Sequence, residues 1–232
     1  MQPNSVTVQK LLDEALSTIL NEKISTTGAG RTDTGVHAKV FSAHFDSALS
    51  ELAVRKNLVY RLNRFLPNDI SVSKIVKVIP DAHARFSALS RTYRYNISKL
   101  KDPFWDETSW FIHGTTDINA MNEACGLLLN YNDFTSFARL HSDNKTNLCR
   151  IFYAVWESSD SRLVFTIKAD RFLRNMVRAL VGTMVEVGAG KMNVKQFEEI
   201  ILAKDRCKAG KSAPAKGLHL VDIEYPDELF IN

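Results

Sequence analysis

The stretch Gly28-Ala29-Gly30-Arg31-Thr32-Asp33-Thr34-Gly35-Val36-His37-Ala38 holds three glycines within eight residues, and one cation and one carboxylate two positions apart. Glycines at this density give a backbone that can adopt positive φ and that lets a ligand come close. Clustered Gly, Thr and Asp also predict a turn-rich loop. A tight surface turn with a solvated aspartate is the plain alternative. The stretch is not a Walker loop, since no Gly-Lys-Ser/Thr follows, and a single Gly-x-Gly is weak evidence for a dinucleotide site.

The rest of the composition is that of an ordinary globular protein. The 232 residues, 45% hydrophobic and 24% charged, suffice for a buried core and exclude disorder as the main description. We expect neither a membrane span nor a signal peptide. Three cysteines far apart in the sequence argue against a disulfide framework or a zinc site and favour a reducing cytoplasm. The formal net charge of +4 permits a nucleic-acid partner without requiring one.

Hydrophobic periodicity predicts helices and strands in both halves of the chain. Thr7 or Ser5 is the candidate cap of the first helix. Together the patterns predict an α+β protein with largely antiparallel sheets, divided near residue 80. The expected helices cover 11–20, 52–66, 118–129, 171–187 and 194–202, and the expected strands cover 36–46, 70–79, 92–97, 149–157, 163–168 and 218–223.

The glycine-rich loop and four later segments together resemble the motifs of the tRNA pseudouridine synthase I (TruA) family. Gly30–Ala38 resembles the signature of that family. The resemblance extends from Met1 to about Pro226. The other matching segments, in the family's order, are Phe86–Ala88 with Arg91–Tyr95, Asn132–Phe137, Phe172–Gly182 and Ala215–Leu220.

The N-terminus departs from the family pattern. Family members begin with a strand and a Tyr-Asp-Gly-Thr…Gly-Trp-Gln segment ahead of the Gln-Pro-Asn that stands here at Gln2–Asn4. This sequence lacks that segment. We expect the absence to leave an unpaired strand edge in the first-half sheet.

The resemblance implies the pseudouridine-synthase fold: an N-terminal α+β half over 1–80 and a C-terminal α+β half over 81–232, with joined, mainly antiparallel sheets and a central active-site cleft. It implies an isomerase (an intramolecular transferase) that converts uridine to pseudouridine in the anticodon stem-loop of tRNA, around positions 38–40 of the tRNA. No metal and no other cofactor is implied. The expected partners are tRNA and a second copy of the chain in a cytoplasmic homodimer, with no membrane.

By resemblance, Asp33 is the essential carboxylate. An aspartate can attack the sugar as a nucleophile or abstract a proton, and the sequence does not choose between these roles. In an apolar cleft it would need a cation to stay ionised, and the resemblance places Arg178 beside it. Tyr93 is expected to stack on a uracil flipped out of its stem, and its hydroxyl could also help to remove the C5 proton. Arg31 would help to extrude the base or contact a phosphate, and Leu220 would pack against the base.

Cationic and aromatic residues elsewhere are candidates for contact with the RNA backbone. Arg171, Arg174 and Arg178 are expected at i, i+3 and i+7 on one helix face, for which a solvated face is the alternative. The same two interpretations apply to the lysine-rich segment Lys204–Lys216. His37 is interpreted as structural, and His83 could equally be a loop hydrogen-bonder. The candidate RNA contacts are His83, Arg85, Phe86, Asn144, Lys145, Arg174 and Lys216.

Two other functions compete with the synthase. A catalytically silent RNA-binding or RNA-folding protein could use the same scaffold, but binding alone needs no carboxylate facing a phosphate-rich ligand. A nucleoside glycosidase would normally need a second carboxylate as its acid, and the glycine-rich loop offers only one.

Overall fold

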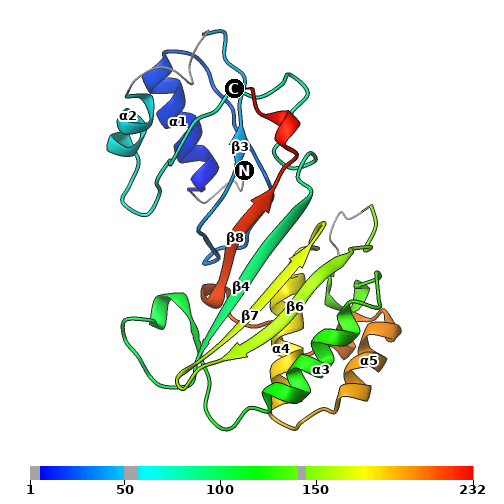
Figure 1. Cartoon of the computed structure of the whole chain (residues 1–232). Coiled ribbons are helices and arrows are strands. Elements are labelled where there is room, and N and C mark those ends of the chain that lie inside the picture. Colours follow the sequence, from blue (N-terminus) through cyan, green and yellow to red (C-terminus); the bar gives the residue numbers. More distant parts are fainter. Residues whose placement is uncertain (1–5, 50–56, 141–144, 232) are drawn as a thin grey trace. The chain divides into compact units, whose positions relative to one another are not determined.

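The computed structural model of this chain describes residues 6–49, 57–140 and 145–231 (Figure 1). The chain forms two compact units. Unit 1 comprises Met1–Gly30, Ser42–Ala88 and Tyr225–Asn232, and unit 2 comprises Arg31–Phe41 and Leu89–Glu224. This division differs from the single boundary expected near residue 80. The chain passes between the units more than once, because the segment with the signature loop pairs with a strand near the C-terminus.

Unit 1 packs helix α1 (Val8–Leu20) against helix α2 (Leu58–Phe65) beside a two-stranded antiparallel sheet of β1 (Thr27–Gly28) and β3 (Ala43–His44). The Thr7 hydroxyl accepts a hydrogen bond from the Lys10 backbone N–H and caps α1, as predicted. Ser5 and residues 52–56 of the expected helix lie outside the described residues. The core is aliphatic and contains Ala15, Leu16, Leu20, Ile24, Leu58, Leu62 and Leu66.

The strand expected over 70–79 is wrong. In this stretch the structure records one isolated bridge, between Val78 and Phe230. The Ile79 N–H donates to the Leu229 carbonyl, and the Ile231 N–H donates to the Lys77 carbonyl, both at 3.0 Å. The β-branched run is therefore extended, but its end bonds to the C-terminal segment instead of entering a ladder.

Unit 2 contains a six-stranded mixed sheet with the order β2-β8-β4-β7-β6, and β5 lies beside β4. The β4, β6, β7 and β8 ladders are antiparallel, whereas β2 joins β8 and β5 joins β4 in parallel. The α+β class is thus confirmed. The strands are β2 (His37–Ala38), β4 (Ser90–Ser98), β5 (Trp110–Phe111), β6 (Ile151–Ser158), β7 (Arg162–Ala169) and β8 (Leu218–Glu224).

The single strand expected over 36–46 is wrong as well. Its first part, β2, pairs with β8 in unit 2, and its last part, β3, pairs with β1 in unit 1. Alternating side chains report an extended backbone but not its partners, so the pattern could not reveal that the two ends join different sheets.

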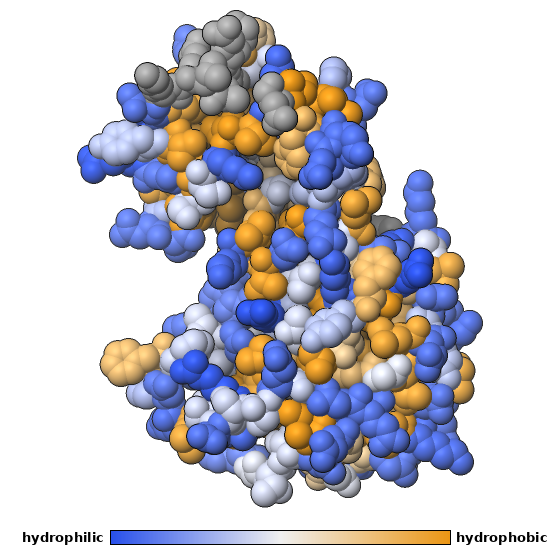
Figure 2. All heavy atoms as spheres, viewed as in Figure 1, coloured by the Kyte–Doolittle hydropathy of each residue, from blue (hydrophilic) through white to orange (hydrophobic). Residues whose placement is uncertain are grey.

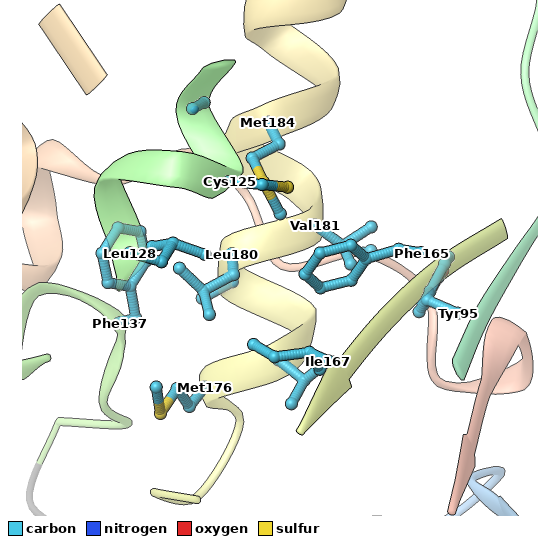
Figure 3. Close-up of a cluster of buried hydrophobic side chains, with 14 of the residues drawn as sticks. Tyr95, Cys125, Leu128, Phe137, Phe165, Ile167, Met176, Leu180, Val181 and Met184 are labelled. Atoms are coloured by element: carbon cyan, nitrogen blue, oxygen red, sulfur yellow. The ribbon is translucent and has the colours of Figure 1, made fainter. Parts of the chain in front are cut away.

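Helices α3 (Ile118–Leu128), α4 (Met176–Gly188) and α5 (Val194–Ala203) complete unit 2. Figure 3 shows α4 between α3 and the sheet: Met176, Leu180, Val181 and Met184 project toward side chains of α3 and β7. These α4 residues are fully buried. On the face in Figure 2, hydrophilic residues cover most of unit 2 and hydrophobic residues are interspersed, as is normal for a globular surface.

The helix expected from Arg171 begins five residues later. Asn175, the residue before α4, has a left-handed backbone with φ 67°, which interrupts the helix ahead of Met176. Arg171 and Arg174 consequently precede the helix, and only Arg178 lies in its first turn. The expected arginine face at i, i+3 and i+7 does not form.

Residues 205–214, which we call the strap, run along α4. At Gly182 an added Cβ would lie 1.8 Å from the Lys211 carbonyl oxygen, so this close approach requires glycine. The Gly210 N–H donates to the Thr183 hydroxyl at 3.0 Å. The strap backbone is thereby fixed to the helix.

Replacing Gly182 with alanine should destabilise unit 2 by about 1–3 kcal/mol, because backbone atoms of the strap must move to admit the methyl group. Gly126, at an exposed position in the last turn of α3, is the matched control, since a Cβ there meets no atom within 4 Å. Gly126→Ala should raise stability by up to about 1 kcal/mol. Urea denaturation measures both variants, and equal effects of the two would contradict the close packing of the strap.

Candidate active site

The Asp33 carboxylate lies between two guanidinium groups. Asp33 sits in the loop ahead of Gly35, whose φ is +82°, and its carbonyl accepts the Val36 N–H at 3.1 Å. The carboxylate Oδ2 accepts a hydrogen bond from Nη1 of Arg178 at 2.8 Å. Nε of Arg174 lies 3.7 Å from the other oxygen, Oδ1. The sequence separates the carboxylate from these arginines by more than 140 residues, and the fold brings them together.

Arg178 is held from two directions. Its Nε donates to the Ala213 carbonyl at 2.8 Å, and the Ala213 N–H donates to the Arg178 carbonyl at 2.9 Å. The strap therefore fixes the end of the side chain that is not engaged by Asp33. A guanidinium with several donors in a rigid fork can satisfy both partners at once.

The Asp33–Arg178 pair is only partly buried. The two side chains are 23% and 21% exposed. Breaking a fully buried pair costs about 3–5 kcal/mol, and solvent screening reduces that figure here to about 1–2 kcal/mol. The pair is thus more significant for orienting the carboxylate than for the stability of the fold.

Tyr93 lies on β4 at an irregularity of the sheet. The β4–β8 register shifts between Thr92 and Tyr93, and such bulges re-aim side chains beside functional sites. The Tyr93 ring meets the Phe172 ring edge-to-face, with centroids 5.2 Å apart. Burial, with a further contribution from the charge of Asp33, raises the pKa of Tyr93 to about 12, although Arg91 opposes this shift. At neutral pH the residue is therefore a neutral phenol.

The neighbours of Tyr93 belong mainly to the core. Leu220 pairs with Tyr93 across β4 and β8 and is only 2% exposed. Its carbonyl accepts the Lys39 N–H at 2.8 Å, which joins β8 to the segment that carries Asp33. Tyr95 is buried and donates its hydroxyl proton to the Pro214 carbonyl at 2.8 Å. Arg31 is exposed.

Three candidate RNA contacts form a cluster in unit 1, the unit that does not contain Asp33. Phe86 is 75% exposed, the His83 ring lies 4.4 Å from its centroid, and the Arg85 guanidinium lies 5.4 Å above it. Nδ1 of His83 accepts the backbone N–H groups of Arg85 and Phe86. His83 is thus a loop hydrogen-bonder that supports an exposed aromatic and a cation.

The remaining candidates lie in unit 2. Lys145 is exposed, and Asn144 lies outside the described residues. Lys216 forms an ion pair with Asp106 at 2.9 Å. His37 stacks on His219 with centroids 4.7 Å apart, and its Nε2 lies 3.0 Å from the Glu107 carbonyl oxygen, which supports a structural role.

Sequence reasoning missed the groups that position the site. Phe172 begins one of the segments that resemble the family's motifs, but the resemblance gives it no role of its own, and the Ala213 backbone has no side-chain signal at all. The nearest available signal was Gly182 in the middle of a strong helix pattern, because an interior glycine that costs helix stability often marks a close approach of another segment.

Comparison with known proteins gives consistent results. A family model described as tRNA pseudouridine synthase matches residues 124–226. A Parabacteroides distasonis protein named tRNA pseudouridine synthase A is 53% identical over 232 residues, which cover 99% of this chain and 91% of that protein. The chain belongs to the tRNA pseudouridine synthase family. Membership of this family classifies it as an isomerase.

Other members of the synthase family are similar over nearly the same extent. The Bacteroides fragilis protein of the same name is 52% identical over 231 residues, covering 99% of this chain and 91% of that protein. A Geobacter sp. member is 36% identical over 232 residues, covering 98% and 92%. The similarity extends across almost the whole chain. It therefore includes the segments that contain Asp33 and Tyr93, which precede the residues matched by the family model.

Among residues 6–49, 57–140 and 145–231 we find no group of three or more His, Cys, Asp or Glu side chains that could hold a metal ion. No helix in this part of the chain has the length and apolar character needed to cross a bilayer.

Proposed function

We propose that this chain isomerises uridine to pseudouridine in tRNA and that Asp33 is its catalytic residue. The observation that carries the proposal is the 2.8 Å contact between Oδ2 of Asp33 and Nη1 of Arg178, in one unit with Tyr93. In the reaction the N-glycosidic bond between N1 and C1′ breaks, the uracil turns, and C5 bonds to C1′. C5 loses its proton and N1 gains one, either directly or by exchange with solvent. Nothing is oxidised and no group leaves the RNA.

The geometry gives each residue a task. Arg178 and Arg174 neutralise the charge of Asp33 and point it in a fixed direction, which suits either attack at the sugar or proton abstraction. Tyr93, a neutral phenol, offers a ring for the flipped uracil. Arg31 beside Asp33 extrudes the base or contacts a phosphate. Leu220, the cross-strand neighbour of Tyr93 on β8, supports the stack of the uracil on the Tyr93 ring.

We further propose the anticodon stem-loop, around positions 38–40 of the tRNA, as the target, and a cytoplasmic homodimer as the active form. The support is the order of five motifs and the cationic residues placed on both units. His83, Arg85, Phe86, Lys145, Arg174 and Lys216, with Asn144, are the proposed RNA contacts.

An unmodified tRNA transcript with a single uridine at one of these positions tests the function. After incubation with the protein, carbodiimide labelling and mass spectrometry should show one labelled residue, located in the anticodon arm. A transcript with cytidine at that position is the control and should stay unlabelled. Tight binding without labelling would favour the silent RNA-binding protein instead.

Substitutions at Tyr93 test the stacking role. Tyr93→Ala should lower the single-turnover rate by about tenfold to a hundredfold, since stacking of one base on an aromatic ring is worth about 1–3 kcal/mol. Tyr93→Phe keeps the ring and should retain most of that stacking.

The raised pKa of Tyr93 also leads to a prediction about the pH dependence of the rate. Because the pKa of Tyr93 is raised to about 12, its proton stays bound in neutral and moderately alkaline solution. The wild type and Tyr93→Phe should therefore show parallel rate–pH profiles between about pH 7 and 10. A wild-type rate that climbs in this range while that of Tyr93→Phe stays flat would identify the phenolate as a base and contradict this account.

Salt dependence tests the backbone contacts. If Lys145 contacts a phosphate, Lys145→Gln should reduce the slope of log affinity against log salt concentration by about 1. Lys195, an exposed lysine of α5 outside the proposed contacts, is the matched control. Filter binding over a range of KCl concentrations gives both slopes, and equal slopes for the two variants would remove Lys145 from the interface.

A further inference from the structure

Arg206 lies at the start of the strap, and its guanidinium donates hydrogen bonds to later residues of the strap. Its Nη1 donates to the carbonyl oxygens of Ala209 and Gly210 at 3.3 and 3.2 Å. Its Nη2 donates to the Ser212 hydroxyl oxygen at 3.0 Å. One guanidinium thus binds three acceptors spread over four residues of the same segment and closes that segment into a compact loop.

The same segment is anchored to α4 at both ends of the loop. The Gly210 N–H donates to the Thr183 hydroxyl, and Nδ2 of Asn175 donates to the Ser212 hydroxyl oxygen at 2.7 Å. The Ser212 hydroxyl oxygen therefore receives hydrogen bonds from Arg206 and from Asn175, the residue that precedes α4. The next residue along the strap is Ala213.

Ala213 connects the strap to the candidate active site. Its carbonyl accepts Nε of Arg178 and its N–H donates to the Arg178 carbonyl, while Nη1 of Arg178 donates to Asp33. The chain of contacts from Arg206 to Asp33 is continuous: Arg206 to Ser212, its neighbour Ala213 to Arg178, and Arg178 to Asp33. Each step is a hydrogen bond or a peptide bond.

We propose that Arg206 is a positioning residue for the reaction, which holds the strap so that Arg178 points its Nη1 at Asp33. Arg206 thereby has a role different from phosphate binding, although it lies in the lysine-rich segment 204–216. The inference rests on the proposed function for its kinetic consequence, but its structural consequence at Arg178 does not depend on that function.

Substitution of Arg206 by lysine and by methionine tests whether the planar guanidinium is needed. A lysine ammonium keeps the charge, but it cannot match a planar guanidinium that serves two backbone carbonyls and a hydroxyl. Arg206→Met and Arg206→Lys should therefore both lower the single-turnover rate, by about tenfold to a hundredfold, because small displacements of a catalytic group have effects of this size. The dissociation constant for tRNA should stay within twofold.

Two further variants keep the test decisive. Ser212→Ala removes a single acceptor, is expected to fold normally and should give a smaller loss of rate in the same direction. Arg150, an exposed arginine next to β6 whose guanidinium lies over the Phe152 ring, is the matched control for loss of a positive charge. Arg150→Met should leave the rate unchanged.

A double-mutant cycle links Arg206 to Arg178. If Arg206 acts through Arg178, then Arg206→Met should cost little further rate in the Arg178→Lys background, because the orientation it maintains is already lost. Additive effects of the two substitutions would overturn the proposal. A rate loss explained wholly by weaker tRNA binding would also overturn it and would make Arg206 a phosphate contact.

A measurement without tRNA separates this proposal from the proposed function. In protein labelled with ¹⁵N-arginine, the Nε–H signal of Arg178 is identified by its absence in Arg178→Lys. Its hydrogen exchange should be at least about tenfold faster in Arg206→Met than in Arg150→Met, since the Ala213 acceptor is no longer fixed. If the wild type makes no pseudouridine, the proposed function fails, and this exchange rate still decides the role of Arg206: equal rates in the two variants would refute it.

Discussion

Asp33→Asn should abolish pseudouridine formation, with a loss of single-turnover rate on the order of 10⁴-fold or more. Asparagine has the shape of aspartate and can still accept the hydrogen bond from Nη1 of Arg178, so the loop should keep its conformation. It has neither the charge nor the basicity needed to attack the sugar or to take a proton. The loss should therefore appear in the chemical step alone.

The affinity for tRNA should not fall in Asp33→Asn. Removal of the carboxylate leaves Arg178 and Arg174 without their anionic partner and makes the site more positive toward an anionic ligand. The matched control is Asp160→Asn, at an exposed position in the turn between β6 and β7, which should be fully active. An Asp33→Asn protein within tenfold of the wild-type rate would show that another group does the chemistry.

Substitution of Arg178 should have the second largest effect. Arg178→Met should reduce the single-turnover rate by on the order of 10³-fold, and Arg178→Lys by on the order of 10²-fold, as expected when a preorganised charge partner is lost. Lysine keeps a positive charge, but it cannot bond both the Ala213 carbonyl and Asp33 in the fixed geometry of a guanidinium.

The same variants have a stability signature. Because the Asp33–Arg178 pair is about four-fifths buried, Arg178→Met should lower the free energy of unfolding by about 1–2 kcal/mol. Asp33→Asn with Arg178→Met should lose less stability than the sum of the single variants, since either one breaks the pair. Urea denaturation gives these values, and strict additivity would mean that the ion pair contributes nothing to the folded state.

The sequence predicted the elements with strong local patterns. The spacing of apolar residues predicts α3, α5 and the β6–β7 hairpin nearly to the residue, and Thr7, one of the two candidate caps, is the cap of α1. These features depend on neighbours in the chain. Burial of one helical stripe or one strand face is encoded within a short window, so a single sequence suffices.

Features that depend on contacts between residues far apart in the sequence could not be predicted from local patterns. The alternation of side chains over 36–46 predicts an extended chain. It does not predict that β2 pairs with β8 while β3 pairs with β1. The left-handed backbone at Asn175, which delays α4, is stabilised by tertiary contacts such as the hydrogen bond to Ser212. The proximity of Arg178 to Asp33 was expected only through resemblance, and the strap that orients Arg178 was not expected at all.

The most direct test of the central claim is to map pseudouridine in an unmodified tRNA transcript after exposure to the wild type and to Asp33→Asn in parallel. We expect one labelled uridine in the anticodon arm, around positions 38–40 of the tRNA, with the wild type and none with Asp33→Asn, although both proteins bind the transcript. Equal labelling by the two proteins, or no labelling by either, would contradict it.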